Sequence, residues 1–120
     1  MLPKKYRLKN TKAFDATYKN HKILSDSVMT VYIGREKKDI SVPSKFGFVV
    51  SKKYHKRSTK RNRIKRLLRE CIRLAIKNEK LGNLNKYMSF IVMPKISEKH
   101  YSLKLKDIEN SFYKIVERIK

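Results

Sequence analysis

The clearest periodic pattern of apolar and polar positions lies between residues 57 and 80. Its apolar side chains return every three or four residues and fall on one arc of a helix: Ile64, Leu67, Leu68, Cys71, Ile72 and Ala75. We expect this helix to begin at Arg57 or Ser58 and to extend to about Lys80, and Gly82 offers a stop. The pattern predicts a long amphipathic helix with one buried side.

Two further stretches show the same helical period. From Thr11 to Lys19 (TKAFDATYK), the aromatic residues Phe14 and Tyr18 are four apart and emerge on one face, with Thr11 as a possible N-cap. Between Leu105 and Ile119, apolar side chains again share one face: Ile108, Phe112, Ile115, Val116 and Ile119. We therefore predict a short first helix and a C-terminal amphipathic helix.

Three runs between these helices are rich in β-branched and aromatic residues, as strands are. Residues 28–33 (VMTVYI) and 45–51 (KFGFVVS) predict a hairpin with a mobile loop over the polar segment 35–44. Residues 87–93 (YMSFIVM), which Pro94 follows, are almost continuously apolar and predict a strand buried on both faces. These runs supply three of the four strands in the predicted element order αβββαβα, and the last two strands are parallel if they are neighbours.

The charge of the chain is both large and local. Its 120 residues include 32 Lys and Arg against 10 Asp and Glu, a formal net charge of +22. No acidic residue occurs between Asp39 and Glu70, where basic residues gather. On the predicted long helix, the side opposite the apolar arc carries Asn62, Arg66, Arg69 and Arg73. A row of basic residues spaced by four lies along the boundary between the two sides: Arg61, Lys65 and Arg69. This distribution favours a polyanionic partner.

Arginine and aromatic side chains together suit single-stranded RNA. A guanidinium group grips phosphate oxygens in pairs, and a base stacked on a ring contributes about 1–3 kcal/mol. Phe14, Tyr18 and Tyr32 are the candidate stacking rings, although Phe14 and Tyr18 can also dock the first helix on the core. We expect the rings of the first helix and the basic row of the long helix to form opposite walls of one groove above the sheet.

Several classes of protein are excluded. No apolar run approaches the roughly 20 residues that a membrane span needs, and no apolar segment follows the basic residues of MLPKKYRLKN, so a secretory signal is not expected. A single cysteine, Cys71, and three scattered histidines make a structural metal site improbable. We expect one cytoplasmic domain over residues 1–120 that does not associate with membranes.

Residues 47–70 read GFVVSKKYHKRSTKRNRIKRLLRE, and this stretch closely resembles the protein subunit of bacterial ribonuclease P. The string RNRIKRLLRE is the hallmark of that family. The resemblance covers nearly the whole chain, because YMSFIVMPK and an amphipathic helix follow, and because further matching residues precede the string: Phe14, Tyr18, Tyr32, Ser51, Lys52 and Lys53.

Two departures from the family pattern occur. Tyr18 stands where many relatives have Phe, which keeps a stacking ring. The segment YHKRSTK lacks the Gly that often follows Ser-Lys-Lys, which leaves the path of this loop open.

The resemblance implies both a fold and a function. The fold is an α+β, α/β-sandwich domain like domain 2 of ribosomal protein S5, with a left-handed crossover around the long basic helix, whereas the general rule predicts a right-handed one. The family's holoenzyme, one catalytic RNA with one protein, removes the 5′ leader from precursor tRNA. The RNA cleaves with bound Mg²⁺, and the protein helps to hold leader, metals and RNA. No protein partner is implied.

The family's functional residues can be carried over position by position. Six would contact the RNA subunit: Lys53, Arg57, Arg61, Asn62, Arg63 and Arg66. Six would face the leader: Phe14, Tyr18, Tyr32, Lys52, Lys65 and Arg69. No catalytic or metal-binding residue of the polypeptide is implied.

Three alternatives are weaker. A protein-only nuclease needs gathered carboxylates or a histidine pair, but the closest acids, Asp107 and Glu109, point to different sides of a helix. A DNA-binding helix-turn-helix needs two helices at a tight turn, whereas a strand precedes the basic helix here. A ribosomal-type or RNA-chaperone protein shares the charge and the fold, and only the RNRIKRLLRE string with the aromatic pair argues against it.

Overall fold

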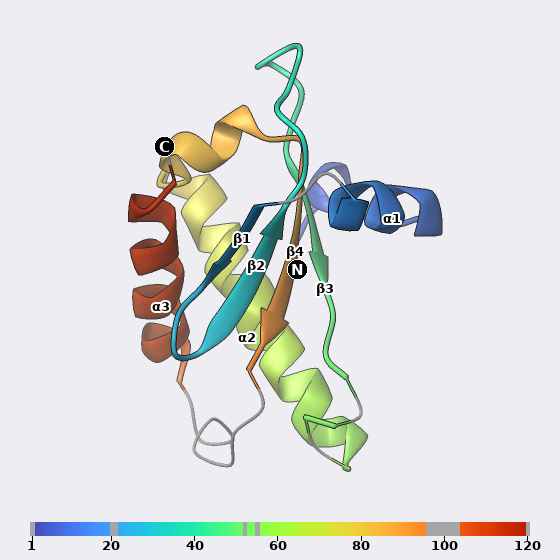
Figure 1. Ribbon diagram of the computed structural model, residues 1–120. Coiled ribbons are helices and arrows are strands. Elements are labelled where there is room, and N and C mark those ends of the chain that lie inside the picture. The colour runs from blue at the N-terminus through green and yellow to red at the C-terminus, as the bar shows by residue number, and fades with distance from the viewer. Residues whose placement is uncertain (1, 20–21, 52, 55, 96–103, 120) are drawn as a thin grey trace.

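The computed structural model of the chain describes residues 2–19, 22–51, 53–54, 56–95 and 104–119. The elements follow the predicted order αβββαβα, with one short 3₁₀ helix (η) before α1 and another before β4 (Figure 1). In chain order they are η1 (Lys4–Tyr6), α1 (Thr11–Lys19), β1 (Lys22–Ser25), β2 (Met29–Ile33), β3 (Lys45–Phe48), α2 (Ser58–Lys77), η2 (Gly82–Lys86), β4 (Ser89–Pro94) and α3 (Leu105–Glu117).

Strand β4 lies inside the sheet, whose order is β1-β2-β4-β3. It pairs antiparallel with β2 and parallel with β3, so the strands before and after α2 are parallel neighbours, as predicted. Phe90, Ile91 and Val92 are all buried, which confirms the expectation of a strand covered on both faces.

The predicted hairpin of β2 with β3 is wrong, because β4 lies between these two strands. Strand β2 pairs instead with β1, whose sequence KILS is too short and too little alternating to be located from its pattern. Strands β2 and β3, although consecutive in sequence, are therefore not neighbours in the sheet, and β3 lies at an edge.

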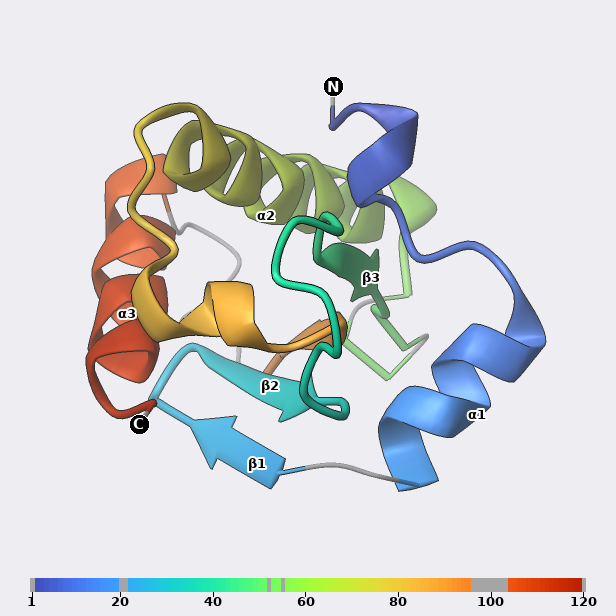
Figure 2. The same ribbon diagram turned by 90° about the horizontal axis from the view of Figure 1, so that it is seen from above.

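The helices divide between the two faces of the sheet (Figures 1 and 2). Helices α2 and α3 pack against each other on one face, and α1 lies on the other face against β2 and β4. The connection from β3 through α2 to β4 is left-handed, as the family resemblance implied and against the general rule.

The main core lies between the sheet and the layer of α2 and α3. Met29, Val31 and Ile33 of β2 enter it, whereas Tyr32, one residue out of phase, faces the side of α1. The predicted apolar arc of α2 is confirmed, because its central members are buried: Ile64, Leu68, Cys71, Ile72 and Ala75. No helix in the described ranges is long and apolar enough to cross a membrane.

The N-cap of α1 differs from the prediction. Asn10, not Thr11, caps this helix, because its side-chain Oδ1 accepts a hydrogen bond from the backbone N–H of Ala13 at 2.8 Å. Thr11 is the first helical residue.

The C-terminus of α2 also differs, because the helix ends at Lys77 rather than near Lys80. The N–H of Lys80 donates to the carbonyl of Ala75 at 2.8 Å, and the N–H of Glu79 donates to that of Ile76 at 3.2 Å. Glu79 takes a φ of +54°, the left-handed conformation that usually favours glycine in this motif. Gly82, the expected stop, lies in η2 with a φ of +56°.

Candidate nucleic-acid interface

Helix α1 packs closely on the sheet at a glycine of β3. A Cβ placed on Gly47 of β3 would lie 2.6 Å from two ring carbons of Phe14, closer than real contacts allow. The ring of Phe14 therefore lies directly against the backbone of β3. An isolated glycine within a strand is a sequence signal for such a close approach.

Two further contacts position α1. The hydroxyl of Thr17 donates to the carbonyl of Ala13 at 2.8 Å and lies 2.6 Å from the hydroxyl of Ser89 on β4. The rings of Tyr18 and Tyr32 meet edge to face, with centroids 5.2 Å apart and planes at 75°. Burial, and secondarily the neighbouring Tyr32 phenol, raises the pKa of Tyr18. The Tyr18 phenol is therefore neutral near pH 7, which suits stacking on a base.

The three predicted stacking residues are brought together by this arrangement. Phe14, Tyr18 and Tyr32 are each only half-buried, so ring surface stays accessible on the α1 side of the sheet. The same rings can therefore hold α1 on the sheet and remain partly exposed, because each packs by an edge or one face and leaves the rest of its surface open.

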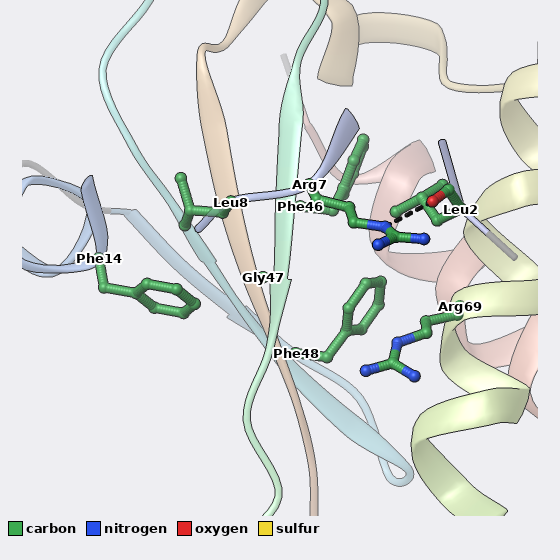
Figure 3. Close-up of a pocket in the computed structure, with 8 residues that line it drawn as sticks. All are labelled: Leu2, Arg7, Leu8, Phe14, Phe46, Gly47, Phe48 and Arg69. Atoms are coloured by element: carbon green, nitrogen blue, oxygen red, sulfur yellow. Dashed lines mark hydrogen bonds between the residues drawn. The ribbon is translucent and has the colours of Figure 1, made fainter. Parts of the chain in front are cut away.

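A pocket of about 210 Å³ lies at the free edge of β3. Figure 3 shows Phe14 on one side of the strand and Phe48 and Arg69 on the other. The N-terminal segment closes the upper part of this edge, because the N–H of Leu8 donates to the carbonyl of Phe46 at 3.0 Å. The Nε of Arg7 donates to the carbonyl of Leu2 at 2.6 Å, so this guanidinium is held beside the pocket.

The expected single groove above the sheet is wrong in its geometry. Helices α1 and α2 lie on opposite faces, so the basic row of α2 cannot form the wall opposite Phe14 and Tyr18 (Figure 2). The two sets meet instead around the edge of β3, where Arg69 and Phe14 line the same pocket. The two sets meet there because β3 is the edge strand and α2, the helix that connects β3 to β4, lies on the face of the sheet opposite α1.

The N-terminal half of α2 carries the predicted cationic side. Lys53, Arg57, Asn62 and Arg66 are exposed, while the other predicted residues are half-buried along the boundary: Arg61, Arg63, Lys65 and Arg69. Lys52 lies outside the described residues. The residues predicted to contact the RNA subunit therefore lie around the start of α2, the end of the helix that follows β3 along the chain.

Farther along α2 the positive charge is reduced by an ion pair. The Nε of Arg73 donates to a carboxylate oxygen of Glu70 at 3.0 Å, and this bond lowers the pKa of Glu70. Arg73, which the helical projection grouped with the basic side, is therefore matched by an acid one turn away. The first half of the helix and the loop before it carry the larger excess of positive charge, because no Asp or Glu occurs between Asp39 and Glu70.

A set of side chains that could hold a metal ion is not gathered in the described part of the chain. No three His, Cys, Asp or Glu side chains there lie close enough to hold a metal ion. Burial raises the pKa of Cys71 to about 12, so its thiol stays protonated at neutral pH.

Several residues of the site were not predicted from the sequence. Arg7, Leu8 and Phe48 line the edge pocket, and Thr17 and Ser89 hold α1 in place. Gly47, against which Phe14 packs, did have a recognisable signal, because it interrupts the apolar run from Phe46 to Val50.

Comparison with known proteins identifies the family. A family model described as Ribonuclease P matches residues 2–119. The chain belongs to the ribonuclease P protein family. A relative from Clostridioides difficile, the ribonuclease P protein component, is 33% identical over 111 residues, which cover 92% of this chain and 89% of the relative.

Other ribonuclease P protein components match shorter stretches. The relative from Clostridium kluyveri is 41% identical over 69 residues, and that from a Synechococcus strain is 36% identical over 87 residues. These matches span only 58% and 62% of the lengths of those two relatives.

Solved structures of ribonuclease P proteins share the fold. The protein from Thermotoga maritima superimposes with a TM-score of 0.75 at 24% identity, covering 95% of this chain and 97% of that one. The protein from Staphylococcus aureus gives a TM-score of 0.70 at 23% identity, with 93% of each chain covered. These likenesses confirm the α+β architecture of four strands and three α-helices.

Proposed function

We propose that this chain is the protein component of a ribonuclease P ribonucleoprotein, which removes the 5′ leader of precursor tRNA in the cytoplasm. The observation that carries the proposal is the family match over residues 2–119. A net charge of +22 and an unmixed basic helix start support a polyanionic partner. The catalytic RNA subunit, one RNA with one protein, is that partner.

The RNA subunit is bound by the start of α2 and the loop before it. The proposed contacts are Lys53, Arg57, Arg61, Asn62, Arg63 and Arg66. Arginine forks grip phosphate oxygens in pairs, and each phosphate contact releases counterions, so affinity falls steeply with salt. The apolar arc of α2 is buried against the sheet, which keeps the opposite side turned outward.

The leader is bound on the face of the sheet beneath α1 and around the edge of β3. Bases stack on Phe14, Tyr18 or Tyr32, whose rings lie together on that face. Phosphates of the same strand meet Arg69 at the edge pocket and Lys65 one turn earlier on α2. Lys52, outside the described residues, is the remaining proposed leader contact. The leader therefore turns around the edge strand instead of lying in one straight groove.

Chemistry is assigned to the RNA subunit and its Mg²⁺ ions. The described part of this chain presents no set of three ligating side chains, so it does not fit a built metal site. The polypeptide contributes binding and orientation: it concentrates positive charge near the RNA and holds the leader in one path. No catalytic residue of the polypeptide is proposed.

A ribosomal-type or RNA-chaperone protein is the second candidate, because the same charge and fold would serve it. The deciding experiment adds the protein to its cognate RNA and precursor tRNA at low Mg²⁺ and measures 5′ maturation. We expect strong stimulation of cleavage. A chain that binds the RNA without stimulating cleavage would favour the second candidate.

A further inference from the structure

Helix α1 divides its face of the sheet into two sides. The buried Thr17 marks the underside of the helix, because its hydroxyl contacts strand β4. At about 100° per residue, Phe14 and Tyr18 lie on one side of Thr17, and Ala13 and Ala16 lie on the other. The rings proposed to stack leader bases therefore occupy one side of α1 only.

A pocket of about 270 Å³ lies on the other side of α1, and we name it the α1 pocket. Its apolar lining is Leu8, Ala13, Ala16 and Met88. The hydroxyl-bearing Ser89, which holds α1 through Thr17, also borders it. The contacts that position α1 therefore also shape this pocket.

The charged side chains of the α1 pocket are positive. Arg35 and Lys45 line it and are exposed, and none of the described residues that line it is acidic. The Nε of Arg35 donates to the sulfur of Met88 at 3.3 Å. This contact holds the guanidinium beside the apolar lining, so one small pocket combines an apolar surface with two cations.

The acids that are close to these residues in sequence are directed elsewhere. Asp15 is exposed and lies almost opposite Thr17 around α1. Glu36 is exposed and forms a bridge pair with Tyr87, which is buried in the main core. Neither acid is part of the pocket lining. The α1 pocket therefore complements an anion that also carries an apolar group.

The α1 pocket adjoins the proposed path of the leader. Leu8 lines both this pocket and the edge pocket, which contains Phe14 and Arg69. Figure 3 shows Leu8 and Phe14 on the same side of β3, next to Gly47. An RNA strand that reaches the edge pocket can therefore continue past Leu8 into the α1 pocket.

We propose that the α1 pocket binds one nucleotide of a long leader, farther along the strand than the nucleotides that stack on the rings. Its phosphate is bound by Arg35 and Lys45, because a guanidinium grips phosphate oxygens in pairs and an ammonium adds a point charge. Its base lies against the apolar lining, where the polarisable sulfur of Met88 suits the face of a ring. The inference rests on the proposed function and extends the leader site to the other side of α1.

The size and place of the pocket favour this occupant over others. Its volume of about 270 Å³ is below the roughly 300–1,000 Å³ range of ligand pockets, so it suits one base better than a larger molecule. A segment of a second protein is disfavoured, because the shared residue Leu8 puts the pocket beside a surface that the proposed function assigns to RNA.

The test measures how the holoenzyme's affinity for precursor tRNA depends on leader length. The precursors carry single-stranded leaders that lengthen one nucleotide at a time from two to twelve. The variant is Arg35→Ala with Lys45→Ala. Beyond a threshold length we expect it to bind roughly 2- to 30-fold more weakly than wild type, as two exposed charge contacts predict. Its log–log salt slope should fall there by about 0.7 per lost contact.

Shorter leaders should bind the variant as they bind wild type. The threshold should exceed the leader length at which Tyr18→Ala first weakens binding, because the rings come earlier on the path. An abasic nucleotide at the threshold position should weaken binding to wild type and have little effect on the variant.

Two further variants sharpen the test. Ala16→Glu puts a carboxylate at the pocket from an exposed helical position and should reproduce the length-dependent loss with the fold intact. Lys106→Ala with Lys114→Ala removes the same charge as the pocket variant from exposed positions on α3, and any effect should be equal at every length.

Three outcomes would overturn the inference. A loss that is equal at every leader length would assign Arg35 and Lys45 to the RNA subunit or the tRNA body. No loss at any length would show that the leader does not reach the pocket. Insensitivity to abasic nucleotides at every position would show that no base uses the apolar lining. Each of these, with cleavage still stimulated by wild type, contradicts this inference alone, whereas a wild-type protein without stimulation contradicts the proposed function.

Discussion

The region beneath α1 and the start of α2 differ in how they are built. Under α1, neutral side chains pack closely: Phe14 lies against the backbone of Gly47, Thr17 meets Ser89, and Tyr18 meets Tyr32. At the start of α2, cationic side chains project from a helix whose opposite side is buried. The first region is defined by contacts between elements, the second by the composition of one helix.

This difference predicts different responses to mutation. Long-range charge attraction tolerates small movements of a side chain, whereas stacking on a ring needs the ring in place. Changes at α2 should therefore alter RNA affinity and its salt dependence without affecting folding. Changes beneath α1 should couple leader binding to stability.

The largest expected effect is on binding of the RNA subunit by Arg61→Ala with Arg63→Ala. Two lost charge-assisted contacts at about 1.5–3 kcal/mol each predict affinity at least roughly 100-fold lower. The log–log salt slope should fall by about one per lost contact. Filter binding over a salt series measures both quantities.

The matched control for that variant is Lys106→Ala with Lys114→Ala, which removes the same charge from exposed positions on α3. If both doubles weaken binding equally, net charge alone matters and the start of α2 has no special role.

Next in size is the effect of Tyr18→Ala on leader binding. Losing a ring that stacks a base costs about 1–3 kcal/mol, so precursor tRNA with a leader of several nucleotides should bind roughly 5- to 150-fold more weakly. Mature tRNA should bind as before, and Tyr18→Phe should retain most of the affinity. Equal weakening for both tRNAs would mean that Tyr18 only docks α1.

Gly47→Ala tests the seat of α1. The added Cβ meets the ring of Phe14, and overpacking of this kind costs about 1–3 kcal/mol in the free energy of unfolding. In a Phe14→Ala background the same change should cost much less, since the contacts at 2.6 Å are gone, only the flexible end of Leu8 at 3.2 Å has to move, and glycine weakens a strand. Denaturant unfolding of the four proteins gives the coupling. Additive effects would show that Phe14 does not occupy this position.

The smallest effect is expected at the far end of α2. Glu79→Gly relieves the left-handed backbone and should stabilise the fold by about 0.5–1 kcal/mol after the entropy of glycine is counted. Asn78→Gly, at a φ of −93°, should bring no gain. RNA affinity should not change in either variant, which would separate helix stability from the charge of the helix start. A parallel gain in affinity would refute that separation.

Much of α2 was predictable because a helix is a local structure. Its start at Ser58, its buried arc and its cationic side all follow from the spacing of residues along one segment. Its exact end was not predictable, because Glu79 in a left-handed conformation is atypical of helix ends.

The site beneath α1 was only half predictable. The aromatic pair Phe14 and Tyr18 was evident from its spacing of four, and Tyr32 was already a candidate stacking ring before the family resemblance also pointed to it. The partners Gly47 and Ser89 belong to strands whose order in the sheet no local pattern encodes. The same limit explains the wrong hairpin and the wrong groove.

Composition and periodicity were enough to predict a basic chain with a polyanionic partner, three helices and a buried apolar strand, because charge and amphipathic spacing are properties of short segments. The insertion of β4 between β2 and β3, the left-handed crossover and the assignment of α1 and α2 to opposite faces arise from packing between distant segments. Strand order depends on which faces can be buried together, and that is a property of the assembled sheet. The proposed path of the leader around the edge of β3 depends on this arrangement.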